Sequence, residues 1–253
     1  YWKVKLNRII PILLLKDRGF YKSTKFKKHR YIGDPINILK IFNEKGIDEA
    51  VIFDISARER ESIDFEYLEE IASECFFPLS YGGFINEYED ARKVIELGFE
   101  KISFCSAFFR NPELVKKCVK SFGSSSVIGT IDYKLTFFNQ QRIFSENCKK
   151  HFNISLIDHV DKIASTGVGE IILNNVDLDG SRKGIKCDDL LNSISRYDQQ
   201  FVFSCGASSH QEILDLAKRH KNYSFAGSTI FVYSSEQNGV LITYPFRDYD
   251  EMF

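Results

Sequence analysis

One carboxylate in the sequence stands where it could move protons. Asp132 closes the run Val127–Asp132, in the segment Thr130-Ile131-Asp132-Tyr133. A carboxylate that ends a buried strand and faces a cavity could serve as a general acid or base. An aspartate there could equally cap the following loop, and its position alone leaves both interpretations open.

Glycine-containing turns follow several candidate strands and point to a phosphate site. Glycines let backbone N–H groups approach an anion, and a following helix N-terminus adds a favourable dipole. Any one of these glycines is more often a simple turn, but several at successive strand ends favour a phosphate-bearing small-molecule ligand. The candidate binding residues are Gly82, Gly83, Asp179, Gly180, Gly206, Gly227 and Ser228.

Four charged residues stand at the opposite ends of the candidate strands. Arg8, Glu49, Lys101 and Glu170 lie at the starts of strands one, two, four and six. Two cations and two anions at one end of a barrel can pair into a neutral ring. The ring would act either as a plug that keeps water out or as a gate for a small neutral molecule, and the spacing alone favours the plug.

The composition excludes several functional classes. The formal net charge is −1, from 34 Lys and Arg against 35 Asp and Glu, which gives no sign of nucleic acid as a partner. Six cysteines form no CxxC pair and five histidines share no spacing, so we predict neither a metal site nor a cofactor. No apolar run reaches 18 residues and no signal-peptide pattern is present, so we expect a cytoplasmic protein without a membrane partner.

The elements that must position these residues are short apolar runs alternating with amphipathic segments, which predicts parallel strands joined by crossover helices. The candidate strands are Arg8–Leu15, Ala50–Ile55, Phe77–Tyr81, Lys101–Cys105, Val127–Asp132, Glu170–Asn174, Phe201–Ser204 and Ser224–Gly227. The candidate helices are Pro35–Lys45, Asp64–Glu74, Glu87–Leu97, Pro112–Phe122, Leu156–Ser165, Asp188–Ser195 and Gln211–His220. Asp34 and Asn111 each place a capping side chain before a proline, which is typical of a helix start.

Internal repetition favours a closed barrel over an open sheet. Ile102–Phe109 (ISFCSAFF) is similar to Tyr223–Phe231 (YSFAGSTIF). Tyr81-Gly82-Gly83 after strand three is likewise similar to Cys205-Gly206-Ala207 after strand seven. Two similar four-strand halves make one closed unit, so we predict a single α/β domain over residues 1–253, a (βα)8 barrel of two half-barrels.

A series of short segments resembles the HisF family, the cyclase subunit of imidazole glycerol phosphate synthase. The segments occur in the family's order over nearly the whole chain. They are Arg8-Ile9-Ile10-Pro11, Gly33-Asp34-Pro35, Gly46-Ile47-Asp48-Glu49, Phe53-Asp54-Ile55, Tyr81-Gly82-Gly83, Phe122-Gly123-Ser124, Ile131-Asp132, Gly169-Glu170-Ile171-Ile172-Leu173 and Asp177-Leu178-Asp179-Gly180.

The resemblance implies a partner and a role for the charged ring. HisF proteins receive ammonia from a HisH-type glutaminase docked at the barrel floor, and the four ring residues match the family's charged gate. The resemblance therefore reverses the preference for a plug. Glu100 stands where the family has an acidic residue important for the glutaminase partner.

The catalytic face departs from the family. HisF uses two aspartates, one ending strand one and one ending strand five; the second is Asp132, whereas the first aligns with Leu14, which transfers no proton. Imidazole ring closure should therefore be impaired by roughly 10²–10⁴-fold. Phe84, Cys105 and Ala207 replace a glycine, an asparagine and a glycine of the phosphate loops, so we expect one phosphate site to be lost.

Other segments resemble HisF-like proteins that help to install acetamidino groups on bacterial surface sugars. They are Pro11–Asp17, Lys25–Lys27, Gly33–Asn37 and the tail Gly227–Pro245, which replaces the usual last helix. This likeness implies an activated N-acetyl sugar of surface polysaccharide as substrate, and an ATP-using sugar amidotransferase as a further partner. The alternatives are a true imidazole glycerol phosphate synthase cyclase and a non-catalytic ammonia conduit that activates the glutaminase.

Overall fold

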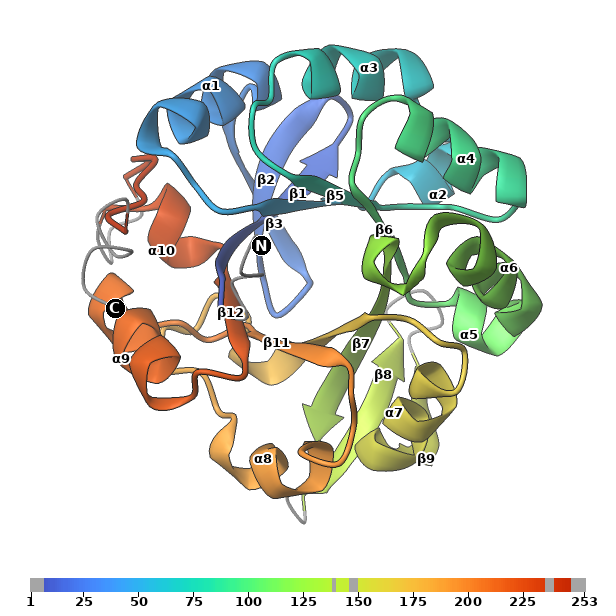
Figure 1. Cartoon of the computed structure of the whole chain (residues 1–253). Helices are drawn as coiled ribbons and strands as arrows, with labels where there is room; N and C mark the ends of the chain where they lie inside the picture. The colour runs from blue at the N-terminus through green and yellow to red at the C-terminus, as the bar shows by residue number, and fades with distance from the viewer. Residues whose placement is uncertain (1–6, 138–139, 146–149, 235–238, 247–253) are drawn as a thin grey trace, which may run out of the picture.

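The computed structural model describes residues 7–137, 140–145, 150–234 and 239–246. Within these residues eight parallel strands form a closed ring, because β10 pairs with β11 on one side and with β7 on the other (Figure 1). The predicted (βα)8 barrel is thus confirmed. Its strands are β1 (Ile9–Lys16), β4 (Ala50–Asp54), β5 (Leu79–Gly82), β6 (Lys101–Phe104), β7 (Val127–Leu135), β10 (Glu170–Asn175), β11 (Gln200–Ser204) and β12 (Ser224–Gly227).

Helices surround the strands, as Figure 1 shows in a view along the barrel. The longer ones are α1 (Pro35–Lys45), α3 (Phe65–Ser73), α4 (Tyr88–Glu96), α6 (Pro112–Phe122), α7 (Leu156–Ala164), α8 (Asp188–Ile194) and α9 (His210–Arg219). The predicted starts of α1 and α6 are confirmed, since the side chains of Asp34 and Asn111 accept hydrogen bonds from backbone N–H groups of the first turn. No helix among the described residues is both long and apolar enough to span a membrane.

Three short helices follow strands directly at the carboxyl end of the barrel. They are α2 (Ala57–Arg60), α5 (Ala107–Arg110) and α10 (Thr229–Val232). The last two continue β6 and β12, so the two segments that are similar in sequence share one strand–helix structure.

Side chains of the strands point alternately into the barrel and outward to the helices, so the strands separate two apolar layers. Inward-facing side chains form a small cluster inside the barrel: Ile10, Ile12, Val51, Ile128, Ile172, Val202 and Ala226. Their outward-facing neighbours pack under the helices in a much larger cluster. Because side chains alternate with a period of two, every second residue of a strand lies on the barrel axis.

Two antiparallel hairpins extend the strands beyond the barrel, and the sequence did not predict either. β2 (Gly19–Thr24) and β3 (Lys28–Gly33) follow β1, and β8 (Gln141–Ser145) and β9 (Lys150–Ser155) follow β7. The basic segment Lys22–Arg30 is therefore mostly paired strand. Its lysines concealed the strand pattern, and one of them, Lys22, is buried with its aliphatic stem covered.

The chain after α10 packs back on the barrel without forming another helix among residues 233–234 and 239–246. Tyr244 donates a hydrogen bond to the carbonyl oxygen of Ile9 at 3.0 Å. Its ring lies 5.1 Å from that of Phe246 and 5.8 Å from that of Phe231, measured between centroids. Among the described residues, an aromatic cluster therefore stands where the usual last helix would lie; the sequence predicted the atypical tail but not the cluster.

Candidate functional site

Two adjoining cavities open at the carboxyl ends of the parallel strands, where barrels of this class place their sites. The larger has a volume of about 650 Å³ and is lined by Asp132, Gly82 and Gly83. The smaller, of about 50 Å³, is lined by Asp179, Gly180, Gly206, Gly227 and Ser228. Leu14, Ser23, Phe26, Phe53 and Asn174 line both cavities. The structure therefore brings the predicted mouth residues together.

Asp132 lies near the end of β7 with its carboxylate in a defined environment. The side-chain amide of Asn174 donates to one of its oxygens at 2.9 Å, and the thiol of Cys105 lies 3.9 Å from the other. Burial, together with the negative charge of Asp132, raises the pKa of Cys105 well above its ordinary value. Cys105 is thus held as a neutral thiol, which can donate to the carboxylate but cannot compete with it as a base.

The wall contributed by β1 is apolar at this level. Leu14 pairs in register with Phe53 of β4, and both side chains line the larger cavity. Asp54, the next carboxylate along β4, accepts hydrogen bonds from the backbone N–H of Ala57 at 2.9 Å and from Arg60 at 2.7 Å. These bonds occupy Asp54 in forming the turn into α2, so Asp132 is the carboxylate best placed for proton transfer.

Asp179 holds the β2–β3 hairpin against the mouth. Its carboxylate pairs with the buried ammonium of Lys22 at 2.6 Å and accepts the hydroxyl of Ser23, also at 2.6 Å. The backbone N–H of Phe26 donates to it as well, at 3.2 Å. This carboxylate is already neutralised and hydrogen-bonded. Asp179 therefore fixes the position of the β2–β3 hairpin beside the predicted phosphate site.

The glycines of the smaller cavity adopt backbone conformations or contacts that other residues could not share. Gly206 has φ +98, and an added Cβ would lie 2.6 Å from the carbonyl oxygen of Gly184. Gly180 has φ +69 and packs against the backbone of the hairpin. The hydroxyl of Ser228 is buried and has no hydrogen-bond partner among the described residues. A buried donor without a partner is costly, and an anion in this cavity would satisfy it.

The four floor residues form a closed ring of ion pairs. Each cation contacts both anions: Arg8 binds Glu49 and lies 2.7 Å from Glu170, while Lys101 lies 2.9 Å from Glu49 and 3.0 Å from Glu170. Burial alone would raise the pKa of Glu170, but the charges of Lys101 and Arg8 outweigh it and hold that pKa below its ordinary value. Glu170 therefore remains ionised inside the ring.

Glu100 lies on the rim of this ring. Its backbone N–H donates to the carbonyl oxygen of Leu79 at 2.9 Å, which fixes the turn into β6. Its side chain is exposed, whereas the neighbouring Lys101 points into the ring. The floor thus presents an exposed acidic side chain directly beside the buried charges.

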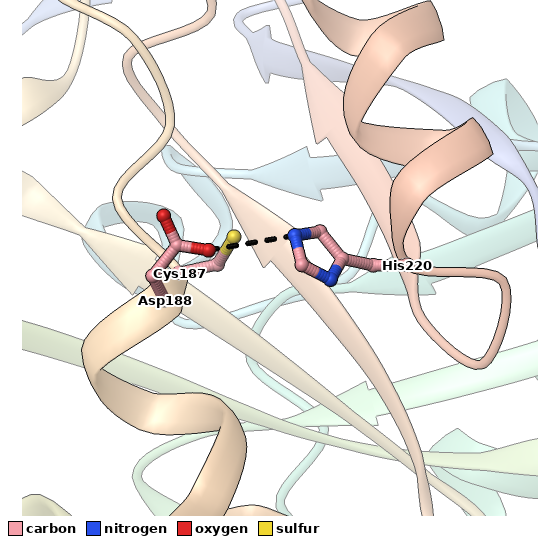
Figure 2. Close-up of side chains that lie close together, drawn as sticks. All are labelled: Cys187, Asp188 and His220. Carbon is pink, nitrogen blue, oxygen red and sulfur yellow. Dashed lines mark ion pairs between the residues drawn. The ribbon is translucent and has the colours of Figure 1, made fainter.

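Possible metal ligands gather at the start of α8. Among the described residues, Cys187, Asp188 and His220 have ligand atoms within 4.8 Å of one another, and Figure 2 shows His220 facing Asp188 across 3.4 Å. Burial raises the pKa of Cys187 to about 11, which disfavours the thiolate that a metal would need. Cys187 and Asp188 lie at the start of α8, and none of the three residues lines either mouth cavity described above.

Three residues of the mouth escaped the sequence-based selection. Asn174 lies near the end of β10, and Arg58 lies in the short helix α2, which the sequence did not predict, so neither residue carried a signal of its own. Asp54 could have been found, because it ends a predicted strand in the same way as Asp132.

Comparison with known proteins places the chain in a family. Residues 8–236 match the family described as histidine biosynthesis protein. A Pseudomonas aeruginosa protein, provisionally named imidazole glycerol phosphate synthase subunit hisF2, is 40% identical over 94% of this chain and 96% of its own length. A Leptospira interrogans protein provisionally named subunit HisF is 37% identical over 95% and 96%. Subunit HisF of Helicobacter hepaticus is 30% identical over 94% of both chains. With these matches covering nearly its whole length, the chain belongs to the HisF family.

Proposed function

We propose that this chain is the ammonia-accepting synthase subunit of a two-component glutamine amidotransferase. The observation that carries the proposal is the ring of Arg8, Glu49, Lys101 and Glu170, which closes the barrel end opposite the cavity lined by Asp132. A HisH-like glutaminase docked at the floor would release ammonia directly against this ring.

The interior of the barrel suits the transfer of ammonia. In bulk water at neutral pH nearly all ammonia is ammonium, which is not a nucleophile. The apolar side chains above the ring keep water out, so ammonia that passes the ring stays unprotonated. At the mouth it would attack an acceptor held by the glycine-lined cavity, and Asp132 would take up or return the proton.

The experiment that tests this proposal follows glutamate release by the HisH-like glutaminase of the same genome, with and without this chain. We expect stimulation that is reduced by Lys101→Met and by Glu100→Gln. Glu113→Gln is the matched control, because Glu113 is also an exposed glutamate but lies in the first turn of α6. Stimulation that is absent, or that is equally reduced by Glu113→Gln, would contradict the proposal.

The names of the relatives favour imidazole glycerol phosphate synthesis as the reaction, since each is called a subunit of that synthase. Growth of a histidine auxotroph supplied with this chain and its glutaminase would support this assignment. Replacing Asp132 with Asn tests catalysis itself, because a passive conduit would tolerate that change.

One observation favours a second acceptor. Leu14 leaves the mouth without the second carboxylate that the family's ring closure uses, and the segments that resemble acetamidino-forming proteins point to an activated N-acetyl sugar. In that case an ATP-using sugar amidotransferase would be a further partner. Failure to support histidine synthesis, together with glutamine-dependent amidination of such a sugar when all three proteins are combined, would favour this acceptor.

A further inference from the structure

The wall of the larger cavity formed by β4, α2 and α5 carries cations whose donors are unused. Arg58 of α2, Arg110 at the end of α5 and Lys16 at the end of β1 all line this cavity. Their side chains make no hydrogen bond or ion pair with any residue described in the structure. The Nη1 atom of Arg58 is, in addition, fully buried without a hydrogen-bond partner among those residues.

A buried guanidinium nitrogen without an acceptor is unfavourable unless something else satisfies it. The nearest strand-end carboxylate does not, because Asp54 binds Arg60 and the N–H groups that begin α2. Glu59, the other acidic residue of α2 at this cavity, is exposed. Arg58 thus lines the cavity and carries a donor that has no acceptor among the described residues.

The loop after β5 carries Phe84 at this wall, where the sequence resemblance places a third glycine. Phe84 has φ +50, a left-handed conformation that glycine adopts freely and a phenylalanine does not. Phe84 lines the cavity and brings an apolar side chain to a position where glycine would leave only backbone. A ligand that enters here must therefore find its charge partners on the neighbouring α2 and α5.

We propose that Arg58, supported by Arg110 and Lys16, binds a phosphoryl group of the acceptor on this side of the mouth. A planar guanidinium offers two parallel donors to phosphate oxygens, and the two further cations suit a dianion better than a carboxylate. The site is separate from the glycine-lined cavity, whose unused buried donor is the hydroxyl of Ser228. This inference rests on the proposed function in one respect: it takes the mouth to be the acceptor site.

The test measures binding of inorganic phosphate and of pyrophosphate to the whole chain by titration calorimetry at low salt, without glutaminase. We expect Arg58→Gln to weaken one class of binding by about 10- to 100-fold, the range for loss of a charge-assisted hydrogen bond. Ser228→Ala should leave that class unchanged. Arg92→Gln is the matched control, because Arg92 is exposed on α4 and pairs with Glu89 and Glu96 outside both cavities.

Several outcomes would overturn the inference: no saturable binding by the natural chain, natural affinity in Arg58→Gln, or an equal loss in Arg92→Gln. If Arg58→Gln unfolds, Arg58→Lys replaces it; we expect intermediate affinity for phosphate, because the charge is kept and the two-donor geometry is lost. Natural affinity in that variant would also refute the geometry proposed. Glutaminase stimulation without Arg58-dependent phosphate binding would refute this inference alone. Arg58-dependent phosphate binding without glutaminase stimulation would refute only the ammonia-accepting role.

Discussion

Removing Lys101 from the floor ring should destabilise the whole barrel. Its ammonium lies 2.9 Å from Glu49 and 3.0 Å from Glu170, and both carboxylate side chains are at most 5% exposed. The change Lys101→Met leaves two buried anions with Arg8 as their only partner in the ring. Loss of one partner from a buried ion pair costs about 3–5 kcal/mol. Because Lys101 itself is partly exposed, we expect a loss of about 3 kcal/mol in unfolding free energy, or about 6–12 °C in Tm.

The unfolding free energy lost in Lys101→Met should depend on pH, because the charges of the ring control the pKa of Glu170. Lys101 and Arg8 lower the pKa of Glu170 against the effect of burial, so the natural ring stabilises the fold above about pH 4.5 and loses this effect as the pH falls through the lowered pKa. Without Lys101 that pKa rises, and Glu170 takes up a proton more readily. The difference in stability between the natural chain and Lys101→Met should therefore shrink as the pH is lowered from neutral toward 4.5.

Urea unfolding of three variants provides the measurement and its control. Adding Glu170→Gln to Lys101→Met restores one cation and one anion, and should recover at least half of the lost free energy. Lys116→Met, which breaks an exposed pair on α6, should change it by no more than about 1 kcal/mol. The reasoning is refuted if Lys101→Met costs no more than Lys116→Met, or if the double variant is less stable than the single one.

Three further changes test other parts of the structure. Burial lowers the pKa of His159, which stacks on Phe109, from 6.5 to about 4. The unfolding free energy should therefore fall by about 3 kcal/mol as the pH is lowered from 6.5 to about 4, because the unfolded chain takes up the proton first. Urea titrations at several pH values should show that His159→Phe abolishes this fall. Gly206→Ala should cost about 2–4 kcal/mol in thermal unfolding, since its φ is +98 and the methyl group would meet Gly184; a variant of natural stability would contradict this. Tyr244→Phe should cost about 1 kcal/mol in urea unfolding, because it removes a buried hydroxyl that donates to β1; an unchanged midpoint would show that ring packing alone anchors the tail.

The barrel could be predicted from the sequence because its strands are buried on both faces. Such strands appear as continuous apolar runs, and each predicted run lies within three residues of the observed strand at either end. The hairpins could not be predicted in the same way. The β2–β3 hairpin carries Lys22 inside it, and a lysine is a strand residue there only because Asp179, more than 150 positions later, neutralises it.

Site residues could be predicted from the sequence only where the residue type and its immediate neighbours indicate a role. Asp132 ends an apolar run, and the glycines mark turns, so both can be recognised locally. Arg58 cannot, because its unused donor depends on Asp54 being occupied by Arg60 instead. Whether Arg58 or Arg60 pairs with Asp54 depends on the geometry of one helical turn, which the spacing of the residues in the sequence does not show.

The alternation of side chains along the strands explains how the floor residues can match the family pattern while the mouth residues depart from it. Arg8 and Leu14 lie six positions apart on one chain segment, and the period of two places both on the barrel axis, with Ile10 and Ile12 between them. Leucine at position 14 therefore removes a carboxylate from the reacting end without disturbing the ion pairs at the other end or the helix layer outside. Because the two ends are separated by an apolar layer, the supply of ammonia and the chemistry of its acceptor can change independently. In the function that we propose, the ring at the floor can thus keep its role in ammonia entry while Leu14 and Phe84 change the acceptor side of the mouth.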